Sequence, residues 1–151
     1  MSNEFVSCLL HVVFGTSHQR NLLSPDARTQ LGAYLSTLAK TKGMKLVAMG
    51  GTENHVHLLL ALPMKLSIES ALLPLKQNSA VFLRQHFDFL KSFNWAKGFA
   101  AYSISRSQLD NTLMYIQSQE QIHWKKSFKE EYIEFLQFHH LPFKEETLFD
   151  D

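Results

Sequence analysis

The sequence predicts an α+β fold, a ferredoxin-like antiparallel sheet covered by helices. Two observations predict it, the alternation of two kinds of segment and the order in which they occur. Short apolar runs rich in Val, Leu and Phe alternate with segments of helical periodicity. The expected order is strand, helix, strand, strand, helix, strand, and two further helices follow. The first six elements match the split ferredoxin-like pattern, and the last two helices are C-terminal additions.

The first strand is expected over the apolar residues 5–15, and a helix follows it after a polar turn. Ser24 is a capping residue and Pro25 suits the first helical position. Leucines at helical spacing supply an apolar stripe, and Gly43 is placed to end the helix.

Two short strands are expected next, at residues 45–49 and 55–62, with a tight turn at residues 50–54 between them. A second helix is expected from Ser67 to residue 86, and Pro74 should kink it or delay its regular part.

A fourth strand is expected at residues 99–105, and Ser107 is expected to cap a third helix, with Asp110 completing a variant capping box. Ser127 repeats that signature before a last helix at residues 128–139. We expect the charged tail from about residue 144 to be frayed.

The composition indicates one globular domain over residues 1–151. Hydrophobic residues make up 45% and charged residues 19%, which argues against disorder. Cys8 is the single cysteine, so no intrachain disulfide can form and the reducing cytoplasm is expected. No signal peptide or membrane span is expected. The net charge of +1 argues against a large electrostatic footprint for duplex DNA, although a local patch can still bind nucleic acid.

The third strand carries a pair of histidines. Side chains alternate along a strand, so His55 and His57 share one side while Val56 and Leu58 point to the other, where helices would cover them. Two imidazoles at this spacing are well placed to bind one divalent cation. An isolated His-x-His is more often structural, so the interpretation needs support from elsewhere.

A row of polar side chains in the third helix gives that support. Tyr115 lies away from the apolar stripe, Gln119 lies one turn further on the same side, and His123 continues the row. The stripe expected to face the core comprises Leu109, Leu113 and Ile116. Taken alone, a tyrosine and a glutamine in a helix are more often a flanking core residue and solvated surface.

Together these motifs resemble the HUH (His-hydrophobic-His) single-tyrosine transposases of bacterial insertion sequences, the IS200-like family, and the related REP-associated tyrosine transposases. The resemblance runs from residue 10 to residue 132. Its specific parts are residues 50–59, residues 98–105 and residues 115–119.

The resemblance implies that His55 and His57 are metal ligands, that Tyr115 is the nucleophile and that Gln119 completes the metal site. It implies cleavage and rejoining of single-stranded DNA at hairpin-flanked sites through a 5′-phosphotyrosine intermediate, by a homodimer associated with the nucleoid. Mg²⁺ prefers oxygen ligands and Mn²⁺ accepts imidazole, so both metals stay open. No Gly-rich phosphate loop is present, and no nucleotide cofactor is expected.

The sequence departs from the family pattern at two positions. Asn54 stands where the family usually has Asp, which can change how a ligand is oriented but removes none. Ile122 precedes a single His123, where the family often has two adjacent histidines. The role of His123, in the metal site, on DNA or in packing, stays open.

Several other residues are candidates for secondary roles. Tyr34, Tyr102 and Tyr132 are rival nucleophiles with simpler structural roles. Trp95 and Phe99 are candidates for stacking on unpaired bases. Candidate phosphate contacts are Lys40, Lys42, Lys45, Lys76, Arg84, Lys97 and Arg106.

Three alternative functions remain. A host enzyme that processes repeated genomic hairpins would use the same chemistry. A binding module would recognise hairpin DNA or RNA without cutting it. A His-x-His metal hydrolase that activates water ranks last, since no Asp or Glu lies near the histidines in the sequence as an obvious further ligand.

Overall fold

A computed structural model describes residues 3–149. It contains a four-stranded sheet and five α-helices within those residues. In chain order these elements are β1 (Leu9–Gly15), α1 (Pro25–Thr41), β2 (Lys45–Gly51), β3 (His55–Ala61), α2 (Ile68–His86), β4 (Ala100–Ile104), α3 (Leu109–Gln117), α4 (Gln119–Ile122) and α5 (Phe128–Phe138).

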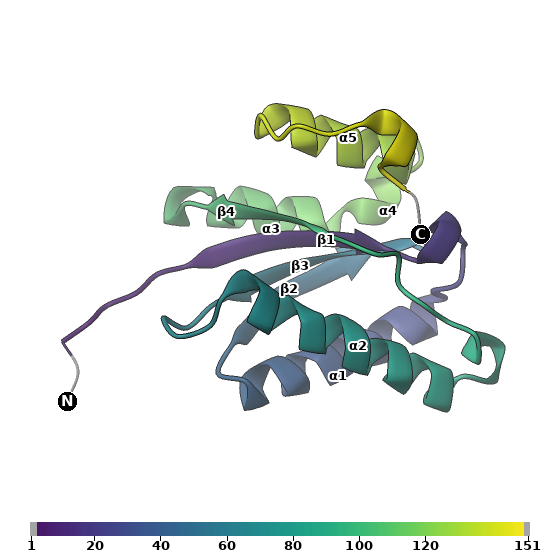
Figure 1. Cartoon of the computed structure of the whole chain (residues 1–151), viewed down its shortest axis with the longest axis horizontal. Coiled ribbons are helices and arrows are strands. Elements are labelled where there is room, and N and C mark those ends of the chain that lie inside the picture. Colours follow the sequence, from purple (N-terminus) through teal and green to yellow (C-terminus); the bar gives the residue numbers. More distant parts are fainter. Residues whose placement is uncertain (1–2, 150–151) are drawn as a thin grey trace.

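The strands lie in the order β2-β3-β1-β4, and every neighbouring pair is antiparallel. Helices α1 and α2 cover one face of the sheet, whereas α3, α4 and α5 lie over the other (Figure 1). The predicted α+β fold is therefore confirmed, including the additional C-terminal helices that carry Tyr115.

The α1–α2 face of the sheet holds the main apolar core. Val56, Leu58 and Leu60 of β3 point into it, as their alternation predicted, and each is fully buried. Burial of an aliphatic side chain stabilises the fold by about 1.5–3 kcal/mol. This face thus supplies much of the stability that the rest of the sheet depends on.

Three serines cap helices as the sequence predicted. The hydroxyl oxygens of Ser24, Ser67 and Ser127 accept hydrogen bonds from backbone N–H groups at 3.2, 3.0 and 3.1 Å, respectively. Helix α2 is continuous through Pro74. Gly43 follows α1 with a φ of +80°, a conformation that glycine adopts without strain.

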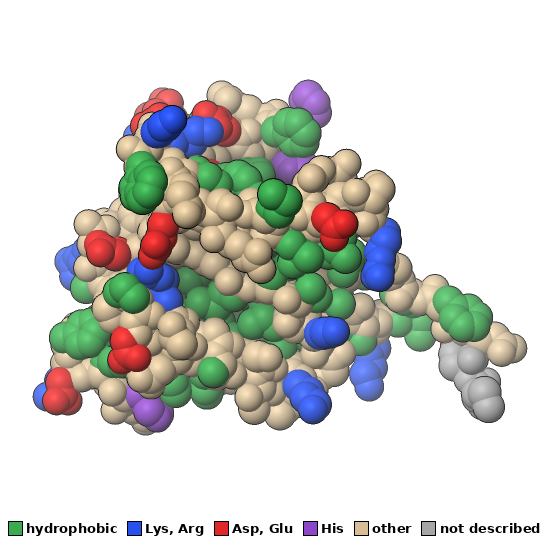
Figure 2. Space-filling view, turned by 180° about the vertical axis from the view of Figure 1, so that it is seen from behind, with side chains coloured by type: hydrophobic (Ala, Val, Ile, Leu, Met, Phe, Trp, Pro, Cys, Tyr) green, Lys and Arg blue, Asp and Glu red, His purple; other side chains and the backbone are tan. Residues whose placement is uncertain are grey.

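Some predicted boundaries were wrong. β1 begins at Leu9, and residues 3–7 project from the body, where Phe5 is 94% exposed (Figures 1 and 2). β2 continues to Gly51 because Gly50 and Gly51 still pair with β3. The turn between these strands is correspondingly shorter than expected.

The tyrosine helix also differs from its prediction. Ser107 lies in a 3₁₀ turn, and α3 begins at Leu109 with no side-chain cap. Helix α3 ends at Gln117, and the short α4 starts at Gln119. Ile116 alone of the predicted stripe is fully buried.

The tail expected to be frayed is packed as far as Phe149. A 3₁₀ turn spans Glu145–Thr147, and Leu148 and Phe149 then contact a second, smaller apolar cluster around Phe128 of α5. These contacts hold the end of the described chain against the α5 side of the sheet.

Neither sign of charge covers the face seen in Figure 2, where Lys and Arg side chains occur together with Asp and Glu. This agrees with the small net charge of +1. Among residues 3–149, none of the helices has the length and apolar character needed to cross a membrane.

Candidate metal and tyrosine site

Two glycines let the C-terminal helices approach the sheet closely. A Cβ atom at Gly50 would lie 1.9 Å from the backbone oxygen of Ile116 in α3. A Cβ atom at Gly15 would lie 2.7 Å from the Phe128 ring of α5. Because neither glycine has a side chain, α3 (which carries Tyr115) and α5 can pack directly against the face of the sheet that bears the two histidines.

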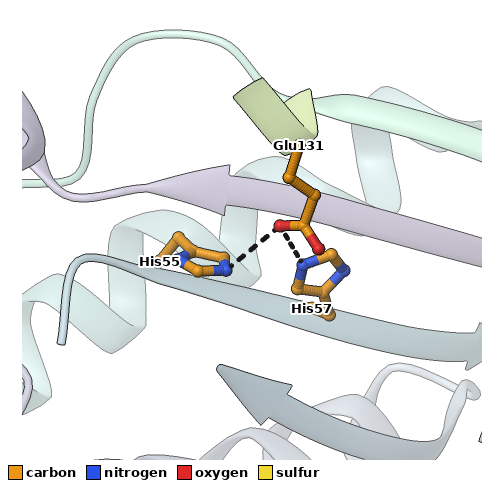
Figure 3. A group of neighbouring side chains, drawn as sticks. All are labelled: His55, His57 and Glu131. Carbon is orange, nitrogen blue, oxygen red and sulfur yellow. Dashed lines mark hydrogen bonds and ion pairs between the residues drawn. The ribbon is translucent and has the colours of Figure 1, made fainter. Parts of the chain in front are cut away.

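His55 and His57 point to this same side, as their spacing predicted, and both are fully buried. Their Nε2 atoms face one carboxylate oxygen, Glu131 Oε1, at 3.4 and 3.1 Å (Figure 3). The three atoms lie within 4.8 Å of one another. One cluster thus contains two histidines of β3, two positions apart, and a glutamate of α5 that lies 74 positions beyond His57.

Gln119 and His123 extend this cluster. The amide oxygen of Gln119 lies 2.9 Å from Nε2 of His55 and 3.1 Å from Nε2 of His123. His123 Nε2 is also 3.0 Å from Glu131 Oε1. Gln119 is only 1% exposed, so it belongs to the cluster rather than to a solvated surface.

The outward-facing nitrogen of each imidazole has a partner of its own. His55 Nδ1 lies 2.9 Å from the side-chain oxygen of Asn54, and His57 Nδ1 lies 2.7 Å from Nε2 of His11. His123 Nδ1 donates to the backbone oxygen of Lys126 at 2.6 Å, since a carbonyl oxygen only accepts. Partners of this kind fix the ring orientation of metal-binding histidines.

The inward-facing atoms fit a divalent cation. Nδ1 of His123 donates to a backbone oxygen, so its Nε2 atom is the one that faces Gln119 and Glu131. Neighbouring ligands of one ion lie about 3 Å apart when each is about 2.1 Å from it. The 3.0–3.4 Å spacing between Glu131 Oε1 and the imidazoles is of that size.

Burial and charge set the protonation of this cluster. Burial holds the pKa of His55 below its ordinary value, although Glu131 opposes this shift. Burial and then His57 lower the pKa of His11 to about 3, so this ring is neutral. Burial alone would raise the pKa of Glu131, but hydrogen bonds from the imidazoles outweigh it and hold that pKa far below its usual range.

Tyr115 reaches the same carboxyl group from α3. Its hydroxyl donates a hydrogen bond to Glu131 Oε2, and Gln119 Nε2 donates to that oxygen at 3.1 Å. The Tyr115 and His57 rings lie edge to face with centroids 5.8 Å apart. Burial, followed by the Glu131 contact, raises the pKa of Tyr115 well above its ordinary value, so the phenol carries its proton.

The structure brings together all four site residues predicted from the sequence, His55, His57, Tyr115 and Gln119, and adds two that were missed. Glu131 lies 74 positions beyond His57, too far for a sequence motif. Its signal was a carboxyl group between Phe128 and Phe135 on the apolar side of α5. The signal of His11 was an imidazole inside the apolar run of β1.

Of the rival tyrosines, Tyr34 lies on the opposite face of the sheet, whereas the Tyr102 ring meets His11 edge to face with centroids 6.1 Å apart. Tyr34 stacks on Phe82 on the α1–α2 side, with ring centroids 4.4 Å apart. Tyr102 stacks on His139 at 4.2 Å, and Tyr132 packs against Phe128 and Phe149. Within residues 3–149, the tyrosine hydroxyl that hydrogen-bonds to Glu131 is that of Tyr115.

Two of the candidate nucleic-acid contacts are buried residues. Trp95 is buried between Phe14 and Phe93, with ring centroids 4.7 and 4.8 Å away, and does not face solvent. Lys76 is also buried, and its ammonium group donates to the backbone oxygens of Ala96 and Gly98 at 2.8 and 2.6 Å. Both side chains hold the segment before β4 in place.

The chain belongs to the IS200-like transposase family, since residues 4–119 match the family described as "Transposase IS200 like". The matched region includes both histidines, Tyr115 and Gln119, and ends before His123 and Glu131. The transposases for insertion sequence element IS200 of Salmonella typhimurium and Salmonella typhi are each 29% identical over 85 residues. That stretch spans 56% of this chain and 56% of each relative.

Two solved structures share the fold. A candidate transposase of Deinococcus radiodurans R1 has a TM-score of 0.66 at 22% identity, covering 79% of this chain and 95% of that chain. A REP-associated tyrosine transposase, solved bound to a REP hairpin, has a TM-score of 0.56 at 15% identity, covering 77% of this chain and 68% of that chain. At these identities the likeness supports the architecture alone.

Proposed function

We propose that this protein is a metal-dependent transposase that cleaves and rejoins single-stranded DNA at hairpin-flanked sites, with Tyr115 as the nucleophile. The observation that carries the proposal is the hydroxyl of Tyr115 held on Glu131, beside two imidazoles that point inward. A phenol is a poor nucleophile near neutral pH because its ordinary pKa is about 10. It therefore needs the assistance that this cluster can give.

We further propose that His55, His57 and Gln119 hold a divalent cation, with Glu131 Oε1 as an additional ligand. Such an ion would polarise the phosphate oxygens of the cut bond. Mg²⁺ and Mn²⁺ both fit a set of nitrogen and oxygen ligands, and the imidazoles favour Mn²⁺.

The surface beside this cluster suits a single strand. A pocket of about 480 Å³ is lined by Asn54, His123 and Trp124, among others, and it includes the side chains of Arg28 and Lys126. Trp124 is 79% exposed, so its ring is free to stack on a base. A second pocket, of about 310 Å³, opens at Tyr115 and Glu131. We propose that the DNA strand enters the site along these pockets. We also propose that the protein acts as a homodimer.

A labelled single-stranded hairpin taken from sequence flanking the gene tests the proposal. Wild-type protein with Mn²⁺ or Mg²⁺ should form a covalent adduct on a denaturing gel, and Tyr115→Phe should form none. Tyr34→Phe, on the opposite side of the sheet, is the matched control and should keep its activity. Binding without cleavage under either metal would instead indicate a recognition module.

A metal hydrolase is the second candidate function. Glu131 now supplies the carboxylate that the sequence did not show, and two histidines with a glutamate form a known zinc ligand set. Such an enzyme would cut through activated water. Cleavage that persists in Tyr115→Phe would favour this function over the transposase.

A further inference from the structure

Glu131 presents its two oxygens to two different sets of atoms. Oε1 faces His55 and His57, whereas Oε2 accepts from the hydroxyl of Tyr115 and from the amide of Gln119. The side chain is 1% exposed, so water does not compete for either oxygen. One carboxyl group therefore joins the proposed metal ligands to the proposed nucleophile.

Within residues 3–149, the Tyr115 hydroxyl donates its hydrogen bond to Glu131. The neighbouring rings of His11 and His57 meet Tyr115 edge to face, with centroids 6.3 and 5.8 Å away. In this hydrogen bond the Tyr115 hydroxyl donates and Glu131 Oε2 accepts, so the phenolic proton already points at the carboxylate oxygen. This is the starting state that proton transfer from a phenol to a base requires.

We propose that Glu131 is a catalytic base, whose Oε2 accepts the proton of Tyr115 as the phenol attacks the phosphate. The proposal rests on the transposase function proposed above. It concerns a residue outside the region that matches the family, which ends at residue 119.

Atoms balance in both directions of the reaction. During cleavage the bond between Tyr115 Oη and phosphorus forms, the bond between phosphorus and the 3′ oxygen breaks, and the phenolic proton moves to Glu131. The departing 3′ oxygen takes a proton from water. During rejoining a 3′-hydroxyl attacks phosphorus and gives its proton to water, while the departing Tyr115 oxygen regains its proton from Glu131.

Helix α5 fixes the base in position from both sides. The Ser127 hydroxyl accepts from the N–H of Glu130 at the start of the helix, at 3.1 Å. Phe128 packs beside Gly15 and stacks on the His55 ring, with centroids 4.2 Å apart. One turn on, Phe135 meets the rings of Tyr115 and His11 at 5.5 and 5.3 Å. These contacts hold Glu131 between the nucleophile and the histidines.

Glu131→Gln tests the proposal, because the amide keeps the shape and a ligand oxygen but cannot accept the proton. At saturating Mn²⁺, the single-turnover rate of adduct formation should fall about 10²–10⁴-fold, the usual contribution of a general base. Mn²⁺ affinity, measured separately by calorimetry, should change less than about tenfold. Glu69→Gln, an exposed position in the first turn of α2 on the opposite face of the sheet, is the matched control and should leave the rate unchanged.

Rescue by small acids sharpens this test. In Glu131→Ala, added formate should restore part of the rate, and the more basic acetate should restore more at equal occupancy. Neither acid should accelerate Tyr115→Phe. A role for Glu131 in packing alone would not give a rate that follows the basicity of the added acid.

Three results would overturn the proposal while wild-type protein still forms the adduct. The first is an unchanged rate in Glu131→Gln. The second is a raised rate, which would mean that Glu131 blocks the site. The third is a loss of Mn²⁺ affinity as large as the loss of rate, which would make Glu131 a ligand only. Failure of wild-type protein to form an adduct would instead overturn the proposed function itself.

Discussion

The two faces of the sheet are equally buried but differ in chemistry. On β3, Leu58 faces α1 and α2 within an apolar core, whereas the adjacent His57 faces α3 and α5, and both side chains are 0% exposed. On β1, Val12 and His11 show the same alternation. Degree of burial therefore does not separate core from site in this protein. Core and site differ instead in the atoms that each buried side chain contacts.

The two faces also differ energetically. Burial of apolar side chains on the α1–α2 face stabilises the fold directly. Burial of imidazoles and a carboxylate costs free energy unless hydrogen bonds or an ion compensate. Because His55, His57 and Glu131 hydrogen-bond to one another and to neighbours, the cost is partly offset. We infer that the polar face is retained for its chemistry.

His57→Ala should have the largest effect on activity. It removes one proposed ligand and leaves Glu131 without one of its partners. A cation contributes several kcal/mol to stabilising transition-state charge, so adduct formation should fall at least about a thousandfold. Mn²⁺ should also no longer raise the melting temperature, which calorimetry checks. A metal-dependent shift equal to that of wild type would contradict the assigned ligand.

Leu58→Ala should have the largest effect on stability. Leu58 is adjacent to His57 in β3 but packs in the apolar core on the other face. Loss of that packing typically costs about 2–5 kcal/mol. Urea denaturation with and without Mn²⁺ measures this loss. The increment in stability from Mn²⁺ should match that of wild type, because the cluster lies on the opposite face. A lost increment would show that the two faces are coupled.

Gly50→Ala should displace α3. Its methyl group would meet the backbone of Ile116, the residue after Tyr115, so the helix must move. Overpacking of this kind costs about 1–3 kcal/mol, and we expect adduct formation to fall as well. Gly32→Ala is the matched control. Its methyl group would lie 3.6 Å from Met49, an ordinary contact, and alanine should stabilise α1 by about 0.5–1 kcal/mol.

Asn54→Ala should have the smallest effect of the four. It removes the acceptor for His55 Nδ1, while the Thr52 hydroxyl remains 3.0 Å from that nitrogen. Loss of such a supporting contact lowers metal affinity about 10–100-fold, and we expect the low end because Thr52 stays. Asn54→Asp keeps an acceptor and should bind Mn²⁺ at least as tightly as wild type. Calorimetric titration compares the three proteins.

Local sequence patterns were sufficient to predict the sheet and the histidine pair of the site. Strand alternation alone placed His55 and His57 on one side, and serine caps located three helix starts. The resemblance to the family added Tyr115 and Gln119, which the fold brings beside the pair.

The remainder depended on contacts that no local pattern encodes. Glu131 becomes a partner of His57 only because α5 folds back over β1, where Gly15 admits Phe128. Trp95 was a candidate for stacking on unpaired bases, but aromatic residues of the core enclose it. Ser107 resembled a helix cap, yet a 3₁₀ turn precedes α3 there.

Mass spectrometry of the covalent adduct tests the central claim most directly. Wild-type protein would be incubated with Mn²⁺ and the hairpin substrate, the DNA trimmed by a nuclease, and the protein digested and sequenced by tandem fragmentation. Our account predicts a nucleotide attached through phosphate to Tyr115, and no such mass when the metal is chelated. Attachment at Tyr34, Tyr102 or Tyr132, or cut DNA with no modified tyrosine, would contradict it.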